Sequence, residues 1–189
     1  LLILGTGFLA HRDNNDLRQR LHEGDLSKDA YFQQLLRLVY RCLFLFCAEE
    51  RTHPGGNVPL LHSKDADSAA CDHYAAGYSL SRLRTRSLRR AARDRYDDLW
   101  QSVSIVFRSL AKGETRLALP ALGGLFTIEQ CPDLDGAALS NRDLLAAMRH
   151  LRWSNGTGRL TAIDYRNMGP EELGSIYESL LELIPTVDI

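Results

Sequence analysis

The stretch SKDAYFQQLLRLVYRCLFLFCAEER, residues 27–51, decides the fold of this chain. Ser27 belongs to the residue types that cap the start of a helix. The apolar residues behind it recur mostly at three- and four-residue steps, and they include Leu35, Leu36, Val39, Leu43, Phe46 and Cys47. An apolar face this broad is typical of a helix that other helices surround. We therefore predict that residues 27–51 form the central and most buried helix.

Helical patterns flank this segment on both sides, and the stretches between them are rich in turn residues. We predict helices over residues 14–24, 69–93, 97–110, 140–151 and 170–184, a turn-rich loop over 52–68 and an irregular connection over 112–126. Ser140 and Asp143 make a capping-box-like start, and RLTAIDYR (159–166) reads as a short strand or hairpin arm. The fold class is mainly α: an irregular helical domain in which that one stretch is the β element.

The 189 residues form one domain in this reading. It has an N-terminal arm (1–26), a helical core (27–151) and a last helix (170–184). Because the chain begins at Leu1 rather than Met and ends on PTVDI, we expect it to be a piece of a longer protein.

The last helix contains EELGSIYESLLEL, residues 171–183, directly after Gly169-Pro170. Pro170 suits the first helical position, and the two glutamates after it complement the positive end of the helix dipole. Apolar residues at helical spacing form one stripe: Leu173, Ile176, Tyr177, Leu180 and Ile184. Gly174 weakens a helix interior, which suggests a close backbone approach there. We predict an interdomain joint at Gly174, Tyr177, Glu178 and Leu181.

Overall charge and cysteine usage narrow the class of protein. The formal net charge is −1, so no global field draws the chain to nucleic acid or membrane. The four cysteines contain no CxxC pair, which favours a reducing cytosol. Cys42 and Cys47 lie in an apolar helical pattern, so we expect both to be buried. The apolar run around them is too short to span a bilayer and contains Arg41, so we expect no membrane partner.

Three stretches invite a chemical interpretation that we do not favour. LLILGTGF (1–8) resembles a strand entering a cofactor loop, but no second strand brings an acid, so we expect a buried segment with a glycine turn and no cofactor. His53, His62, Cys71 and His73 lie too far apart in sequence for a typical zinc site, and no metal is predicted. Glu49 and Glu50 read as solvated charge at a helix end.

The most informative polar stretch is SRLRTRSLRRAARDR, residues 81–95, which we call the arginine segment. On one continuous helix, Arg82, Arg86, Arg89 and Arg93 would form a basic ridge able to contact DNA phosphates. The alternative is that these arginines pair with nearby acids and solubilise a surface helix. An exposed, unpaired ridge would favour DNA; an acid-paired or buried one would favour a scaffold.

Several segments in order carry a resemblance to a known family: LGTGFLAH (4–11), LLRLVYRCLFLFCAEER (35–51), YSLSRLR (78–84), DDLW (97–100), LPALGGLF (119–126), LSNRDLLAAMRHL (139–151) and DYRNMGPEELGSIYESLLEL (164–183). Together they resemble the region upstream of the catalytic domain in large adenine-specific DNA methyltransferases. These enzymes belong to type II restriction–modification systems with fused activities and to related phage-defence systems. The resemblance covers nearly the whole chain, and its last segment is the most specific.

The resemblance implies a parent enzyme that uses S-adenosylmethionine to methylate a flipped adenine at N6. Its catalytic motif, Asn/Asp-Pro-Pro-Tyr, does not occur here, so no catalytic residue can be assigned. The expected role is a connector that positions an adjacent methyltransferase domain and contacts DNA backbone. The alternative is a protein-interaction module that docks another phage-defence subunit.

Overall fold

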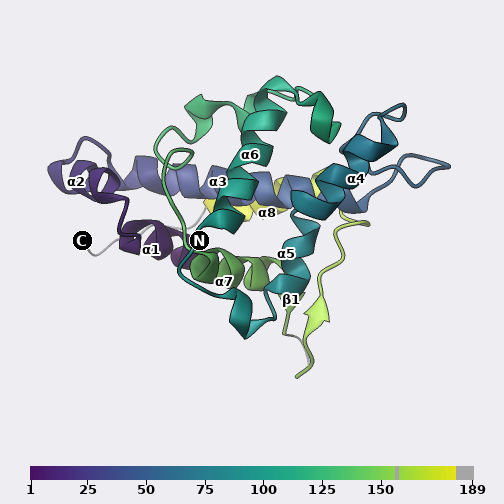
Figure 1. The fold of residues 1–189 in the computed structure, drawn as a ribbon. Helices are drawn as coiled ribbons and strands as arrows, with labels where there is room; N and C mark the ends of the chain where they lie inside the picture. The colour runs from purple at the N-terminus through teal and green to yellow at the C-terminus, as the bar shows by residue number, and fades with distance from the viewer. Residues whose placement is uncertain (156–157, 182–189) are drawn as a thin grey trace.

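The computed structural model describes residues 1–155 and 158–181 and is mainly helical, with one two-stranded antiparallel sheet (Figure 1). The helices are α1 (Leu2–Ala10), α2 (Asn15–Glu23), α3 (Lys28–Glu50), α4 (Ser68–Gly77), α5 (Ser81–Arg86), α6 (Asp98–Lys112), α7 (Asn141–Arg152) and α8 (Pro170–Leu181). Short 3₁₀ turns are η1 (Arg90–Ala92), η2 (Thr115–Leu117), η3 (Gly124–Phe126) and η4 (Ile128–Gln130). The strands are β1 (Trp153–Ser154) and β2 (Thr161–Ala162). The predicted fold class is confirmed.

Helix α3 is the centre of the molecule, as its apolar face predicted. The Ser27 side chain accepts a hydrogen bond from the backbone N–H of Ala30 and caps the start of the helix. Leu36, Leu45 and Phe46 are fully buried, and in Figure 1 α3 runs through the middle of the ribbon. Each such side chain contributes about 1.5–3 kcal/mol of hydrophobic stabilisation. Cys42 and Cys47 are buried, as expected.

Helix α1 corrects the predicted glycine turn, because LILGTGFLA is helical throughout. Its two glycines serve packing between helices instead. A Cβ on Gly5 would lie 3.0 Å from Leu35 Cδ1 on α3, and one on Gly7 would lie 2.8 Å from Leu139 Cδ1 and 2.8 Å from Asp143 Cβ. Close approach of α1 to α3 and to the start of α7 offsets the low helix propensity of glycine.

The predicted continuous helix over 69–93 is wrong: the chain forms α4, α5 and η1 with breaks between them. Glu49, at the end of α3, causes the first break. Its carboxylate accepts from the backbone N–H groups of Leu80 (2.8 Å) and Ser81 (2.7 Å), from Ser79 Oγ (2.8 Å) and from Tyr74 Oη (2.6 Å). In a continuous helix the N–H groups of Leu80 and Ser81 would donate to carbonyls one turn earlier; here they donate to the Glu49 carboxylate on α3 instead.

The remaining elements follow the sequence pattern more closely. Ser140 caps α7 by accepting from the N–H of Asp143, so the predicted helix start at Ser140 is confirmed. The 112–126 connection is irregular and contains η2 and η3. Strand β2 lies within the predicted β stretch and pairs with β1 through Trp153–Ala162 and Ser154–Thr161. Within the described residues, no helix is both long and apolar enough to cross a bilayer.

Helix α8 lies against α3, and its partly buried Leu173 and Ile176 pack on the core. The close approach expected at Gly174 is not found, since a Cβ there would meet no described atom within 4 Å. Glu178 is exposed. The side chains of Tyr177 and Leu181 lie outside the described part of the structure, as does the predicted end of the helix at Ile184.

Candidate nucleic-acid interface

The arginine segment is bent rather than helical throughout. Of the four arginines of the predicted ridge, only Arg82 and Arg86 share a helix, α5, whereas Arg89 precedes η1 and Arg93 follows it. The predicted single ridge therefore does not form. The second break comes at Ser87, which is fully buried and whose Oγ donates to the carbonyl of Arg84 at 2.6 Å.

The arginines of this segment are mostly unpaired. Among the described residues, Arg84 is the member of residues 81–95 that lies within 4.0 Å of a carboxylate, at 3.7 Å from Glu50. Arg86 and Arg89 are exposed, and Arg93 donates to the carbonyl of Ser87 at 2.6 Å rather than to an acid. Ion pairing with the nearby aspartates, the alternative explanation for this composition, is thus not what the structure shows.

The surroundings of α5 disfavour the charged form of Arg82. Burial lowers the pKa of Arg82, and the neighbouring charge of Arg86 lowers it further, while Asp98 and Glu49 raise it. Arg82 Nε and Arg93 Nε are both buried and have no hydrogen-bond partner among the described residues. Unsatisfied cationic donors next to like charges favour the approach of an anion.

The end of the arginine segment opens into a cavity of about 450 Å³, which we call the arginine groove. Arg93 and Arg95 meet Arg12 from the α1–α2 turn and Arg142 from the start of α7 there. Tyr96, 63% exposed, also lines the groove. Sequence reasoning missed Arg12 and Arg142, because they are distant in the chain and isolated in pattern.

Four aspartates balance the charge of the groove: Asp13, Asp94, Asp97 and Asp143. Three of them have local structural partners. Asp94 accepts from the N–H of Tyr96 (3.0 Å) and from Asn141 Nδ2 (2.8 Å), Asp97 from Gln101 Nε2 (2.9 Å), and Asp143 from Ser140 Oγ (2.7 Å).

The two arginines of the groove that pair with aspartates are exposed. Arg12 Nε lies 3.5 Å from Asp13, and Arg142 Nε lies 3.4 Å from Asp143, with the two arginine side chains 87% and 69% exposed. Exposed pairs of this kind contribute little, about 0–1 kcal/mol, so both guanidinium groups can be drawn to another anion.

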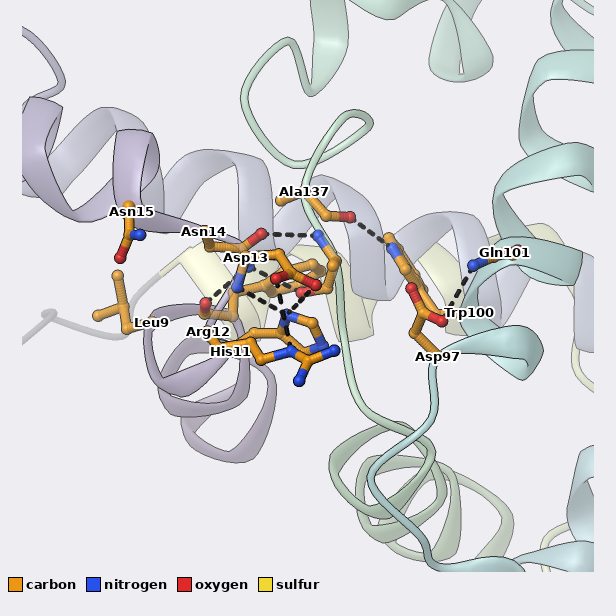
Figure 2. Close-up of polar contacts among 12 residues, drawn as sticks. Leu9, His11, Arg12, Asp13, Asn14, Asn15, Asp97, Trp100, Gln101 and Ala137 are labelled. Carbon is orange, nitrogen blue, oxygen red and sulfur yellow. Dashed lines mark hydrogen bonds and ion pairs between the residues drawn. The ribbon is translucent and has the colours of Figure 1, made fainter.

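Two buried asparagines hold the walls of the groove together. Asn14 Nδ2 donates to the carbonyls of Phe8 and Ala138, both at 2.7 Å, and its Oδ1 accepts from the N–H of Ala138 at 2.8 Å. Figure 2 shows Asn14 beside the chain at Ala137, whose carbonyl accepts from Trp100 Nε1 at 2.7 Å.

On the other wall, Asn141 Oδ1 accepts from the N–H of Leu99, while its Nδ2 donates to Asp94 and Asp98. Because buried amides satisfied on both ends fix the backbones they join, the groove is largely preformed.

Arg41 and Arg152 are fully buried and hold parts of the fold together, a role that we did not predict from the sequence. Arg41 donates to the carbonyls of Leu125 (2.8 Å) and Thr127 (3.0 Å) and to Asp135 (2.5 Å). Arg152 donates to Glu50, so the expectation of solvated charge at Glu49 and Glu50 is wrong.

Two buried cysteines and two of the loop histidines have structural surroundings. Burial raises the pKa of the Cys42 thiol to about 12 and that of Cys131 to about 11, which keeps both protonated and inert. Among the described residues, no group of three or more His, Cys, Asp or Glu side chains is arranged to hold a metal ion. His53 and His62 instead contact backbone carbonyls, of His62 and Ala118.

Comparison of the chain with protein-family models, with curated proteins and with solved structures found no match.

Proposed function

We propose that this chain is a non-catalytic helical domain of a DNA adenine N6-methyltransferase or restriction–modification enzyme, and that it contacts the DNA backbone. The observation that supports this most is that the exposed Arg86 and Arg89 have no ion pair among the described residues, in the same segment that supplies Arg93 and Arg95 to the arginine groove. The ordered segments that resemble the region upstream of the catalytic domain supply the link to methyltransferases. S-adenosylmethionine would bind the adjacent methyltransferase domain in the bacterial cytoplasm, and this chain takes no cofactor.

Guanidinium groups suit this role because their planar N–H donors match phosphate oxygens. The bend after Arg86 spreads the arginines along a curved path from α5 to the groove, where Arg93 and Arg95 join Arg12 and Arg142. Exposed Tyr96 offers an aromatic face at the same place. Phosphate contacts fix position without reading sequence, which fits a connector that leaves base recognition to other domains.

The connector role rests on α8. This helix packs on α3 through Leu173 and Ile176, while Glu171, Ser175 and Glu178 are exposed. A following domain attached through α8 would be oriented by the central helix of this one. Gly174, Tyr177, Glu178 and Leu181 remain our proposed joint with the methyltransferase domain.

The test is the salt dependence of DNA affinity in the full-length enzyme and in this domain. Each phosphate contact makes log affinity fall with log salt at a slope of about −0.9. Arg86→Ala with Arg89→Ala should make that slope shallower by about 2, on duplexes of any sequence.

A matched control removes the same charge elsewhere: Lys112→Ala with Arg116→Ala, where Arg116 is exposed and paired with Glu114. This control should leave the slope unchanged. If the arginine-segment variant keeps both affinity and slope, the DNA contact is wrong, and docking of another phage-defence subunit becomes the better explanation.

A further inference from the structure

A second cavity, about 630 Å³ in volume, lies between the start of α5 and the 162–167 segment that leads to α8. Its polar wall includes Glu49, Glu50, Ser81, Arg84, Arg152 and Arg166. The volume falls in the range of small-molecule sites, about 300–1,000 Å³. The cavity therefore has room for a charged group together with what is attached to it.

Arg152 is a fully buried cation in this wall with only part of its donors used. Its Nη2 donates to Glu50, and its guanidinium carbon lies 4.5 Å from the centroid of the Phe46 ring and 5.2 Å from that of Tyr165. Its Nε and Nη1 have no hydrogen-bond partner among the described residues. Buried charged donors are almost always satisfied, so unused ones in a cavity wall point to a missing acceptor.

Ser81 gives a second, independent indication. Its Oγ is also buried and has no hydrogen-bond partner in the described part of the chain, although its backbone N–H is bonded to Glu49. Arg84 and Arg166 line the same cavity and are only loosely held. Arg84 lies 3.7 Å from Glu50, and Arg166 Nε donates to the Glu50 carbonyl at 3.3 Å. One acceptor group could thus meet donors from α5, α7 and the 162–167 segment.

The carboxylates of the cavity limit the charge of that acceptor. Glu49 already accepts from four donors, Glu50 from Arg152 and the N–H of Tyr165, and Asp164 from Arg166 N–H and Asn167. These three carboxylates balance the charge of the three arginines. A doubly charged anion would therefore be repelled more than a singly charged one.

We propose that this cavity binds a phosphodiester group, whose single negative charge accepts from Ser81 Oγ, Arg152 and the arginines at the rim. This rests on the proposed function, in which the phosphodiester belongs to the DNA backbone. Occupancy would tie the arginine segment, through Ser81 and Arg84, to the segment that leads to α8. DNA contact and the position of the joint would then be coupled through one site.

The site can be tested without DNA, by thermal unfolding in dimethyl phosphate against sodium chloride at equal ionic strength. At about ten times its Kd, the ligand should raise the Tm of the wild-type protein by about 3–6 °C. Ser81→Ala should lose this rise without lowering the Tm in chloride, because it breaks no existing hydrogen bond. Arg166→Gln should also reduce the rise, and inorganic phosphate at pH 8, a dianion, should give a smaller one than dimethyl phosphate.

Arg116→Gln, at an exposed arginine outside both this cavity and the arginine groove, is the control and should keep the full response to dimethyl phosphate. A full response in Ser81→Ala would overturn the site, whatever the arginine-segment variant does to DNA binding. If Ser81→Ala loses the response to dimethyl phosphate but binds duplex DNA as wild type does, the assignment of the ligand to DNA is wrong. Loss of both in Ser81→Ala supports the proposal, even if Arg86 and Arg89 make no DNA contact.

Discussion

Helix α3 and the arginine segment both have helical periodicity and both contain arginine, yet they fold differently. Helix α3 is continuous over Lys28–Glu50, and its Arg41 is fully buried. Residues 81–95 break after Arg86, and most of their arginines reach no carboxylate among the described residues. Residue type therefore does not determine the role of an arginine in this protein; what the rest of the fold brings to it does.

The largest effect should come from removing the cation of α3. Arg41→Ala should destabilise the protein by about 3–5 kcal/mol, because Asp135 and two carbonyls are left buried without their donor. Urea unfolding measures this free energy. Arg41→Met with Asp135→Asn, which removes both charges and restores volume, should recover part of the loss. An Arg41→Ala cost below about 1 kcal/mol would mean that α3 tolerates the loss of its charge as a surface helix does.

A smaller loss of stability should follow when the contacts of Glu49 at the break between α4 and α5 are removed. Glu49→Ala leaves the N–H of Leu80 and the hydroxyls of Tyr74 and Ser79 without their acceptor. The N–H of Ser81 loses its 2.7 Å bond to Glu49 and keeps the 3.1 Å bond to Ser79 Oγ. We expect a loss of about 2–3 kcal/mol and faster hydrogen exchange at Leu80 and Ser81. Glu49→Gln, which keeps one acceptor oxygen, should cost less. Unchanged exchange at both amides would show that the bend does not depend on Glu49.

The difference between the two regions also explains what could be predicted from the sequence. The apolar spacing and the Ser27 cap of α3 are local, and so is the Ser140 cap of α7, and each was predicted correctly. The bend at Leu80 depends on Glu49, 31 positions earlier, and the arginine groove joins Arg12 to Arg142 across the fold. The residue spacing within 81–95 gives no indication of the Glu49 contact or of the groove, because both depend on residues far away in the sequence.

The predicted glycine turn near the N-terminus was wrong for the same reason, because the role of these glycines depends on distant parts of the chain. A glycine pair in a short apolar run reads as a turn, because glycine has a low helix propensity. Its advantage on α1 appears only when α3 and α7 are in place and leave no room for a side chain at Gly5 and Gly7. The DNA contact and the joint on α8 remain predictions.

Two glycine variants extend the comparison to a glycine with a close neighbour and a glycine without one among the described residues. Gly7→Ala places a Cβ 2.8 Å from Asp143 Cβ and should cost about 1–3 kcal/mol through overpacking. Gly174→Ala meets no described atom within 4 Å and should stabilise α8 by about 0.5–1 kcal/mol. Thermal unfolding of both variants checks the signs. A loss of stability at Gly174 would indicate the close approach that the described residues do not show.

The smallest effect on stability should come from the exposed arginines of the arginine segment, Arg86 and Arg89. Arg86→Ala with Arg89→Ala removes two exposed side chains with no ion pair among the described residues, so unfolding free energy should change by less than about 0.5 kcal/mol. The change could even be favourable, because Arg86 lowers the pKa of Arg82 through repulsion. Urea unfolding at low and at high salt measures this.

Salt supplies the control, since it screens repulsion between exposed charges and should bring the variant closer to wild type. A loss above about 1 kcal/mol would mean that these arginines hold the fold as Arg41 does, and the contrast between the two regions would fail. Unchanged stability combined with a shallower salt slope of DNA binding would assign the arginine segment to recognition of phosphate, because nothing in the fold itself then requires its charge.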